Sequence, residues 1–167
     1  MTNCIEVRGL CKSYGDFALK DVDLTLPGGS ILGLIGENGA GKTTVIKCIL
    51  NLIHRDAGTI RLLGYDNVKE ERLAKEDVGI VLDECFFHDN LRPRDVGRIL
   101  APSFHTWDEA LFRNYLDKFG LPEKKLIKEF SRGMKMKLSL SAALAHRPKL
   151  LILDEATAWT QWSGMKF

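Results

Sequence analysis

The chain has 167 residues, of which 45% are hydrophobic and 28% charged, a composition typical of a globular protein rather than a disordered or fibrous one. The formal net charge of +2 gives no electrostatic indication of a nucleic-acid partner or an anionic membrane surface. No apolar stretch approaches the ~20 residues that span a bilayer, and the first residues lack the basic and apolar regions of a signal peptide.

The N-terminal third of the chain predicts strands followed by a helix. Segments 5–8 and 22–26 alternate between apolar and polar residues, as half-buried strands do, and the second ends at a Pro-Gly-Gly turn at 27–29. The apolar run 31–35 predicts a buried strand. The spacing of apolar residues in 43–53 predicts a helix with one apolar side.

Between that strand and that helix lies the phosphate-binding pattern G-x-x-x-x-G-K-[ST]. Its residues, together with the next Thr, are Gly36, Glu37, Asn38, Gly39, Ala40, Gly41, Lys42, Thr43 and Thr44. The glycines let backbone amides point into one concavity, and the helix adds its positive N-terminal end. Lys42 supplies a charge for the β- and γ-phosphates, and the Thr43 hydroxyl suits Mg²⁺. An ordinary glycine-rich turn is disfavoured, because every fixed position and both flanking elements agree.

The rest of the chain predicts two strands, a helical stretch, and a last apolar strand. The strands are 58–64, 78–82 and 150–153, and the helices are 95–101, 108–119 and 132–145. Four cysteines lie far apart without a C-x-x-C pair, so we expect reduced thiols of a cytosolic protein rather than metal ligands.

The last predicted strand ends in the acidic pair Asp154-Glu155. In a parallel sheet such strand ends face the ligand crevice. We expect Asp154 to hold Mg²⁺, directly or through water, and Glu155 to orient or deprotonate the water that attacks the γ-phosphate. The acidic pair is a weak signal alone, and the phosphate loop upstream makes it a strong one.

A third motif begins the predicted helix 132–145, where the sequence is Phe130-Ser131-Arg132-Gly133-Met134. Here the chain resembles the nucleotide-binding domain of ATP-binding cassette transporters, whose signature Leu-Ser-Gly-Gly-Gln stands at this place. Ser131 and Gly133 match it, whereas Phe130, Arg132 and Met134 depart from its commonest form. The resemblance implies that this segment contacts the γ-phosphate of ATP bound to the opposite protomer. The alternative is that Ser131 is an ordinary helix N-cap.

The resemblance implies an α/β fold with a P-loop NTPase core, in which helices flank a mixed or parallel sheet. An N-terminal antiparallel portion and a helical subdomain at 86–146 belong to it, and the C-terminal strands are missing, so residues 1–167 form one incomplete nucleotide-binding domain. Tyr14 matches the aromatic residue that stacks on adenine. Asp83 stands where the family usually has a Gln that reaches Mg²⁺, and its carboxylate also suits Mg²⁺. The implied ligands are ATP and Mg²⁺.

The resemblance also implies partners and a location. They are a second nucleotide-binding domain, identical or different, and a separate membrane permease, with no nucleic acid. The chain would lie in the cytoplasm, on the inner face of the cell membrane. Five apolar residues of the helical subdomain are docking candidates, although we expect most of them in the core: Phe86, Phe87, Leu91, Phe104 and Trp107.

The family pattern does not continue to the end of this chain. The family proceeds to Ser-Gly-Leu-Asp-Pro and later to a His that contacts the γ-phosphate, but no His here follows Glu155. Residues 159–167 form a divergent tail. When codons that can encode this tail are read one base earlier, they can encode Leu-Asp-Pro-Val-Val-Arg-Asp-Glu-Ile, a plausible continuation of the family pattern. We therefore hypothesise a frameshift, and a genuine divergent ending is the alternative. We expect weak ATP binding, little hydrolysis and an exposed apolar sheet edge.

Three functions remain open. The first is the ATPase subunit of a transporter, most like subunits that energise exporters of small molecules or peptides. The second is a soluble cassette ATPase of translation or DNA repair, although the tandem cassettes and coiled-coil insertions of those proteins are not seen here. The third is a catalytically impaired nucleotide-binding remnant. A simple P-loop kinase is disfavoured, because it would have no signature segment.

Overall fold

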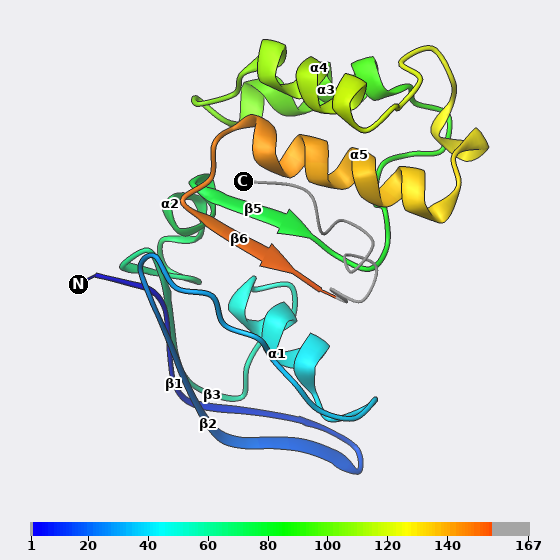
Figure 1. The fold of residues 1–167 in the computed structure, drawn as a ribbon. Helices are drawn as coiled ribbons and strands as arrows, with labels where there is room; N and C mark the ends of the chain where they lie inside the picture. The colour runs from blue at the N-terminus through cyan, green and yellow to red at the C-terminus, as the bar shows by residue number, and fades with distance from the viewer. Residues whose placement is uncertain (1, 155–167) are drawn as a thin grey trace. The chain divides into compact units, whose positions relative to one another are not determined.

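The computed structural model describes residues 2–154, which form two compact units. The first unit ends at Glu76 and the second begins at Asp77. The first holds an antiparallel sheet with helices α1 and α2, and the second holds a parallel strand pair with helices α3, α4 and α5 (Figure 1). This mixture confirms the expected α/β class, and a single domain over 1–167 stays a prediction.

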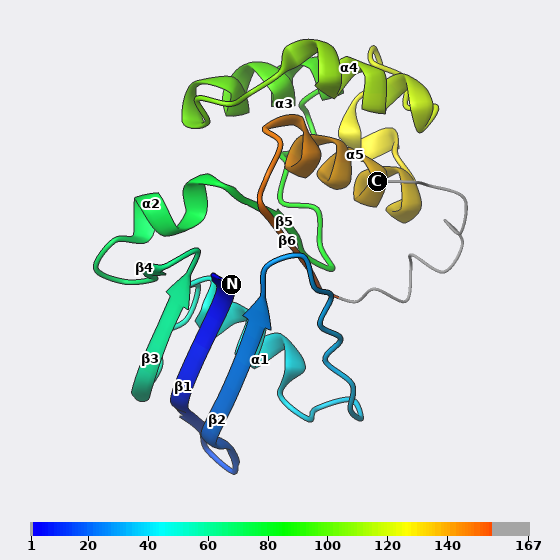
Figure 2. The same cartoon turned by 60° about the vertical axis from the view of Figure 1, so that its left-hand side comes forward.

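The sheet of the first unit has the strand order β2-β1-β3-β4, and every neighbouring pair is antiparallel. Its strands are β1 (Asn3–Tyr14), β2 (Phe17–Pro27), β3 (Ala57–Leu62) and β4 (Tyr65–Asp66). Figure 2 shows β3, β1 and β2 side by side, with α1 behind them. A two-residue turn joins β1 to β2, and Gly15 supplies its left-handed residue at φ 49.

Alternation of apolar residues explains which face of this sheet is buried. Ile5 and Val7 of β1 are buried and stand opposite Leu62 and Ile60 of β3, which are also buried. Successive strand residues point to opposite faces, so such pairs form one apolar face under the sheet. The predicted strands at 5–8 and 22–26 are confirmed, and that at 58–64 is confirmed as far as residue 62, because Leu63 and Gly64 form a turn with left-handed backbone.

Helix α1 (Lys42–Ile49) follows the phosphate loop and ends before the predicted limit at residue 53. Asn51 has a left-handed backbone at φ 52, and the Leu52 amide donates to the Lys47 carbonyl oxygen at 2.9 Å. This is a Schellman ending, and asparagine is one of the few residues besides glycine that adopt it. Helix α2 (Glu71–Glu76) was not predicted, because six residues are too few for a clear helical period.

The predicted buried strand 31–35 is wrong. Residues 31–35 have no strand conformation, and the Ile31 and Ile35 side chains are fully or almost fully exposed, at 101% and 97%. A strand needs a neighbour for its amides and carbonyls, and no strand among residues 2–154 pairs with this segment. Apolar composition therefore did not suffice to make a strand here.

The second unit is built on two parallel strands, β5 (Val78–Val81) and β6 (Leu150–Leu153), which pair residue by residue. Helix α5 packs closely against β5. A Cβ atom on Gly79 would lie only 2.9 Å from the Ala143 carbonyl oxygen and from Pro148 Cγ. The strand can approach the helix this closely only because residue 79 lacks a side chain.

Three helices belong to this unit: α3 (Pro93–Leu100), α4 (Glu109–Lys118) and α5 (Arg132–Ala145). Short 3₁₀ segments at Ala101–Ser103 and Ile127–Glu129 connect them. The three predicted helices are confirmed, with shifts of one or two residues at their ends. None of the helices within residues 2–154 is long and apolar enough to cross a membrane.

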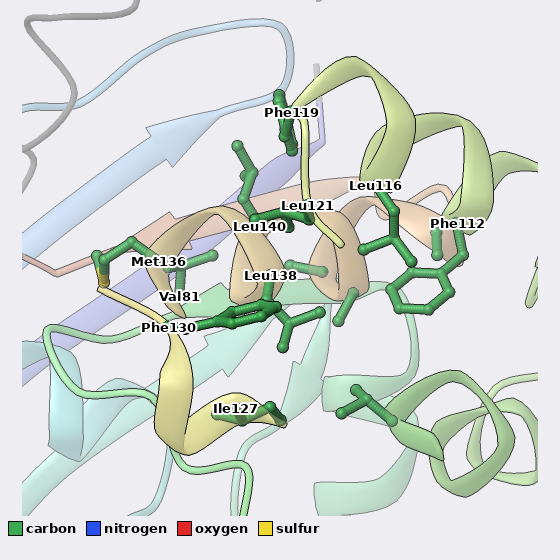
Figure 3. Packing of buried hydrophobic residues seen from close by; sticks show 14 residues of the cluster. Val81, Phe112, Leu116, Phe119, Leu121, Ile127, Phe130, Met136, Leu138 and Leu140 are labelled. Atoms are coloured by element: carbon green, nitrogen blue, oxygen red, sulfur yellow. The ribbon is translucent and has the colours of Figure 1, made fainter. Parts of the chain in front are cut away.

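The core of the second unit lies between these helices and the strand pair (Figure 3). Burial of each large apolar side chain stabilises the unit by about 1.5–3 kcal/mol. The labelled members are Val81, Phe112, Leu116, Phe119, Leu121, Ile127, Phe130, Met136, Leu138 and Leu140.

Candidate nucleotide-binding site

The phosphate loop of the first unit has the backbone that its glycines predict. Gly39 and Gly41 adopt left-handed conformations at φ 86 and 94, and Gly41 is the N-cap residue of α1. A hydrogen bond from the Ala40 amide to the Glu37 carbonyl oxygen, 3.1 Å, closes the turn. Left-handed residues followed by a helix N-terminus turn backbone amides toward one point, as an anion site requires.

Lys42 begins α1 and folds back across the loop. Its ammonium donates hydrogen bonds to the carbonyl oxygens of Gly36 at 2.7 Å and Glu37 at 2.8 Å. The lysine charge is therefore held at the loop, where a bound phosphate chain would meet it. Thr43 and Thr44 follow in the first turn of the helix and are partly buried.

Tyr14 lies at the hairpin end next to this loop. It pairs with Phe17 across the hairpin, and a Cβ on Gly41 would lie 2.8 Å from Phe17 Cζ and 2.7 Å from Leu19 Cδ2. The hairpin therefore packs directly on Gly41, and any side chain at position 41 would push it away. The Tyr14 ring is 47% exposed, so a flat ligand can reach it. Stacking on adenine stays a prediction that this geometry supports.

Two predicted carboxylates follow neighbouring strands of the second unit. Asp154 directly follows β6, is 5% exposed, and donates its amide to the Val81 carbonyl oxygen at 2.9 Å. Asp83 follows β5. Because β5 and β6 are parallel and in register, both residues lie at the C-terminal end of the strand pair. Glu155 lies outside the described residues, so its role stays a prediction.

The metal role of these residues is also a prediction. Within residues 2–154, no group of three or more His, Cys, Asp or Glu side chains is arranged to hold a metal ion. Mg²⁺ in phosphoryl-transfer sites is held by one or two protein groups together with substrate phosphates and water. Thr43, Asp154 and Asp83 are the kind of donors that such a site uses.

The signature segment forms the N-terminus of α5. Ser131 is the N-cap, with its Oγ accepting a hydrogen bond from the Met134 amide at 3.2 Å. Arg132 and Gly133 are exposed in the first turn. The ordinary capping role of Ser131 is therefore confirmed. An additional role toward phosphate is compatible with it, because a helix N-terminus carries a partial positive charge that favours an anion.

A pocket of about 560 Å³ lies in the second unit beside this helix end. Its lining residues are Asp83, Glu84, Cys85, Phe130, Arg132, Lys135 and Met136. The ammonium of Lys135, a residue of α5, donates to Oδ1 of Asp89 in the loop after β5 at 2.7 Å. This contact holds the pKa of Asp89 below its ordinary value and raises that of Lys135. Sequence reasoning did not find this pair, because the two residues are far apart in the chain.

Of the five docking candidates, Phe86 stands apart because 72% of its side chain is exposed. Phe87, Leu91 and Trp107 pack against the core of the second unit, as expected for most of them. Phe104 stacks on the His146 ring, with 4.1 Å between the ring centroids.

Comparison with known proteins gives consistent results. The sequence model of a family described as ABC transporter matches residues 19–158. The ABC transporter ATP-binding protein YtrB of Bacillus subtilis (strain 168) is 36% identical over 154 residues, which are 92% of this chain and 52% of that protein. The bacitracin transport ATP-binding protein BcrA of Enterococcus faecalis is 35% identical over 158 residues, covering 93% and 51%. The chain thus spans about half the length of these relatives.

Solved structures agree on the fold. One described as the ATP binding subunit of an ABC transporter superposes with a TM-score of 0.81 and 28% identity, covering 91% of this chain and 66% of that one. A second, cbiO1 from Clostridium perfringens, part of the complex cbiONQ, gives a TM-score of 0.72 at 23% identity and supports the fold alone.

Proposed function

Since this chain belongs to the ABC transporter family, we propose that it binds Mg-ATP through its phosphate loop and forms part of an ATP-hydrolysing transport subunit. The observation that carries the proposal is the position of Lys42, whose ammonium is held against the loop by Gly36 and Glu37. The Tyr14 hairpin packs on the same loop at Gly41 and offers an aromatic surface for the base.

Each group of the phosphate loop has a distinct task in this proposal. The loop amides and the Lys42 ammonium bind the β- and γ-phosphates, and the Thr43 hydroxyl and Asp154 carboxylate hold Mg²⁺. The metal, when bound, neutralises charge on the phosphoryl oxygens. Asp83, at the same end of the strand pair as Asp154, is a further Mg²⁺ ligand. Glu155 orients the attacking water.

The signature segment serves a second copy of the domain. Ser131 and the first-turn residues of α5, Arg132, Gly133 and Met134, contact the γ-phosphate of ATP held by the phosphate loop of a partner domain, identical or different. Two observations support this assignment: the start of α5 is exposed, and the Ser131 cap fixes the backbone of its first turn. Two such domains would then enclose two nucleotides.

The partner in the membrane is a separate permease, which holds the subunit on the cytoplasmic face. Relatives named for bacitracin transport and for lantibiotic transport, the latter SrtF of Streptococcus pyogenes, support an exporter of peptide-like substrates. The exposed Phe86 ring is the side chain of the second unit best suited to dock on that partner.

A second candidate function is nucleotide binding without efficient turnover. The exposure of Ile31 and Ile35 directly before the phosphate loop favours it, because a loop without a buried strand beneath it is less rigidly positioned for catalysis. ATP turnover separates the two functions, whereas ATP binding is common to both.

Binding of a fluorescent ATP analogue with Mg²⁺ tests the shared part of the proposal. Lys42→Ala should weaken binding by more than about tenfold, because it removes the only charged contact of the loop with the phosphates. Lys47→Ala is the matched control, since Lys47 is an exposed lysine in the last turn of the same helix. Equal affinities of the wild-type chain and Lys42→Ala would exclude the phosphate loop as the binding site.

A further inference from the structure

One carboxylate, Asp56, fixes the end of strand β1 through three consecutive residues. Its Oδ1 accepts a hydrogen bond from the Lys12 ammonium at 2.9 Å, and its Oδ2 accepts one from the Ser13 amide at 2.7 Å. Its own amide donates to the Cys11 carbonyl oxygen at 2.8 Å. Asp56, which stands just before β3, therefore binds residues 11–13 through both its carboxylate and its backbone amide.

The two charges of this arrangement differ in exposure. The Lys12 side chain is only 14% exposed, whereas that of Asp56 is 46% exposed. The hydrogen bond from Lys12, followed by that from the Ser13 amide, lowers the pKa of Asp56, and the same contact raises the pKa of Lys12. Both groups therefore stay charged around neutral pH.

Lys12 also contacts the next aromatic residue of the strand. Its ammonium lies over the Tyr14 ring, 4.9 Å from the ring centroid, which is within the range of a cation–π contact. One face of the ring is thus taken by the ammonium. Tyr14 as a whole remains 47% exposed, so its side chain is accessible to a ligand.

The end of β1 also has a defined position relative to the phosphate loop. Tyr14 pairs with Phe17, and the Phe17 ring packs on Gly41 at the start of α1. The distance between the Tyr14 ring and the loop therefore depends on where β1 ends and how firmly that end is held. Asp56 and Lys12 fix that end with their side chains, in addition to the pairing of β1 with β2.

We propose that Lys12 and Asp56 are positioning residues for the nucleotide base, which hold the Tyr14 ring so that adenine stacks on the face opposite the Lys12 ammonium. This inference rests on the proposed binding of ATP at the phosphate loop. It assigns the pair to the base and not to the phosphates, because the polar contacts of Lys12 and Asp56 are with each other, with the backbone of residues 11 and 13, and with the Tyr14 ring.

The test compares Mg-ATP with magnesium tripolyphosphate, which has the phosphates without the base, by isothermal titration calorimetry. Lys12→Met keeps the length of the side chain and removes the charge, and Asp56→Asn removes the charge of its partner. Each should weaken ATP binding by about fivefold and change tripolyphosphate binding by less than about twofold. Lys12→Arg keeps a cation for both contacts and should restore ATP affinity.

Two controls make the test specific. Lys20→Met, on the exposed side of β2, should change neither affinity. Tyr14→Ala should weaken ATP selectively, and Lys12→Met should have no further effect on ATP in that background, because its target is gone. A purely structural role of Lys12 would still lower affinity there.

The outcomes are distinct. Equal losses for ATP and tripolyphosphate in Lys12→Met and Asp56→Asn, or full additivity with Tyr14→Ala, would overturn the positioning role while leaving the phosphate loop as the binding site. Failure of the wild-type chain to bind tripolyphosphate, or binding that survives Lys42→Ala, would overturn the proposed function itself.

Discussion

Two apolar segments of similar composition differ in structure in this protein: one forms a strand and the other does not. Residues 31–35, Ile-Leu-Gly-Leu-Ile, precede the phosphate loop, have no strand structure and are exposed except for the half-buried Leu34. Residues 150–153, Leu-Leu-Ile-Leu, precede Asp154 and form β6, paired in register with β5. The difference shows that an apolar run becomes a strand only when a neighbour satisfies its backbone and covers its side chains.

The largest expected effect comes from placing a charge in each segment. Ile152→Asp buries a carboxylate in place of a side chain that is 7% exposed and should lower the free energy of unfolding by about 3 kcal/mol or more. Ile35→Asp replaces a side chain that is 97% exposed and should change it by less than about 0.5 kcal/mol. Urea unfolding followed by circular dichroism measures both. A similar cost for the two substitutions would show that 31–35 is buried in solution.

Alanine in place of Gly33, or of Gly79 in β5 (the strand that pairs with β6), should have intermediate effects. Gly79→Ala in β5 would bring a Cβ to 2.9 Å from the Ala143 carbonyl oxygen and should cost about 1–3 kcal/mol of stability. Gly33→Ala meets nothing within 4 Å and should be neutral or stabilise the chain by about 0.4–1 kcal/mol. Thermal unfolding compares them, and a marked loss for Gly33→Ala would mean that another element packs on the segment.

A smaller effect on stability should depend on pH and should arise near β6 but not in residues 31–35. His146, four residues before β6, is 2% exposed. Burial lowers its pKa, and this effect is larger than the opposite one of the Val78 and Ala142 backbone groups, which raise the pKa. The unfolded chain, with an ordinary His pKa of about 6.5, then binds more protons than the folded chain just below that pH. Stability is therefore complete above pH ~6.5 and falls as the pH falls through the window below it.

His146→Phe isolates this contribution, because it keeps a ring that can stack on Phe104 and removes the titrating group. The wild-type chain should lose more stability than the variant between pH 7.5 and about 5.5 in urea unfolding. Segment 27–36 contains no titratable side chain, so it contributes nothing to this difference. Parallel pH profiles for the two chains would exclude His146 as the source.

Much of the candidate site was predictable because its signals are local. The glycines at 39 and 41 predict left-handed backbone before a helix, and the structure has both. The N-cap role of Ser131, which was the alternative to the signature interpretation, is observed, and the signature role stays a prediction. Asp154 follows a confirmed apolar strand. In each case a few consecutive residues carry the constraint, so chain neighbours alone suffice.

Contacts between distant residues were not predictable in this way. Lys12 lies in β1 and Asp56 stands just before β3, and no pattern along the chain marks them as partners of Tyr14. The same holds for Lys135 and Asp89. Charged residues are common on protein surfaces, and only the folded chain determines which of them meet.

The sequence by itself determined the family, the phosphate loop, the helices of the second unit and the place of Asp154, because glycine conformations, capping residues and apolar periods act over a few residues. Only the tertiary structure decided that 150–153 is a strand and 31–35 is not, and that Asp56 holds the end of β1 beside Tyr14. Strand pairing and ion pairs join residues far apart in the chain, and their free energy depends on neighbours that a local pattern does not specify.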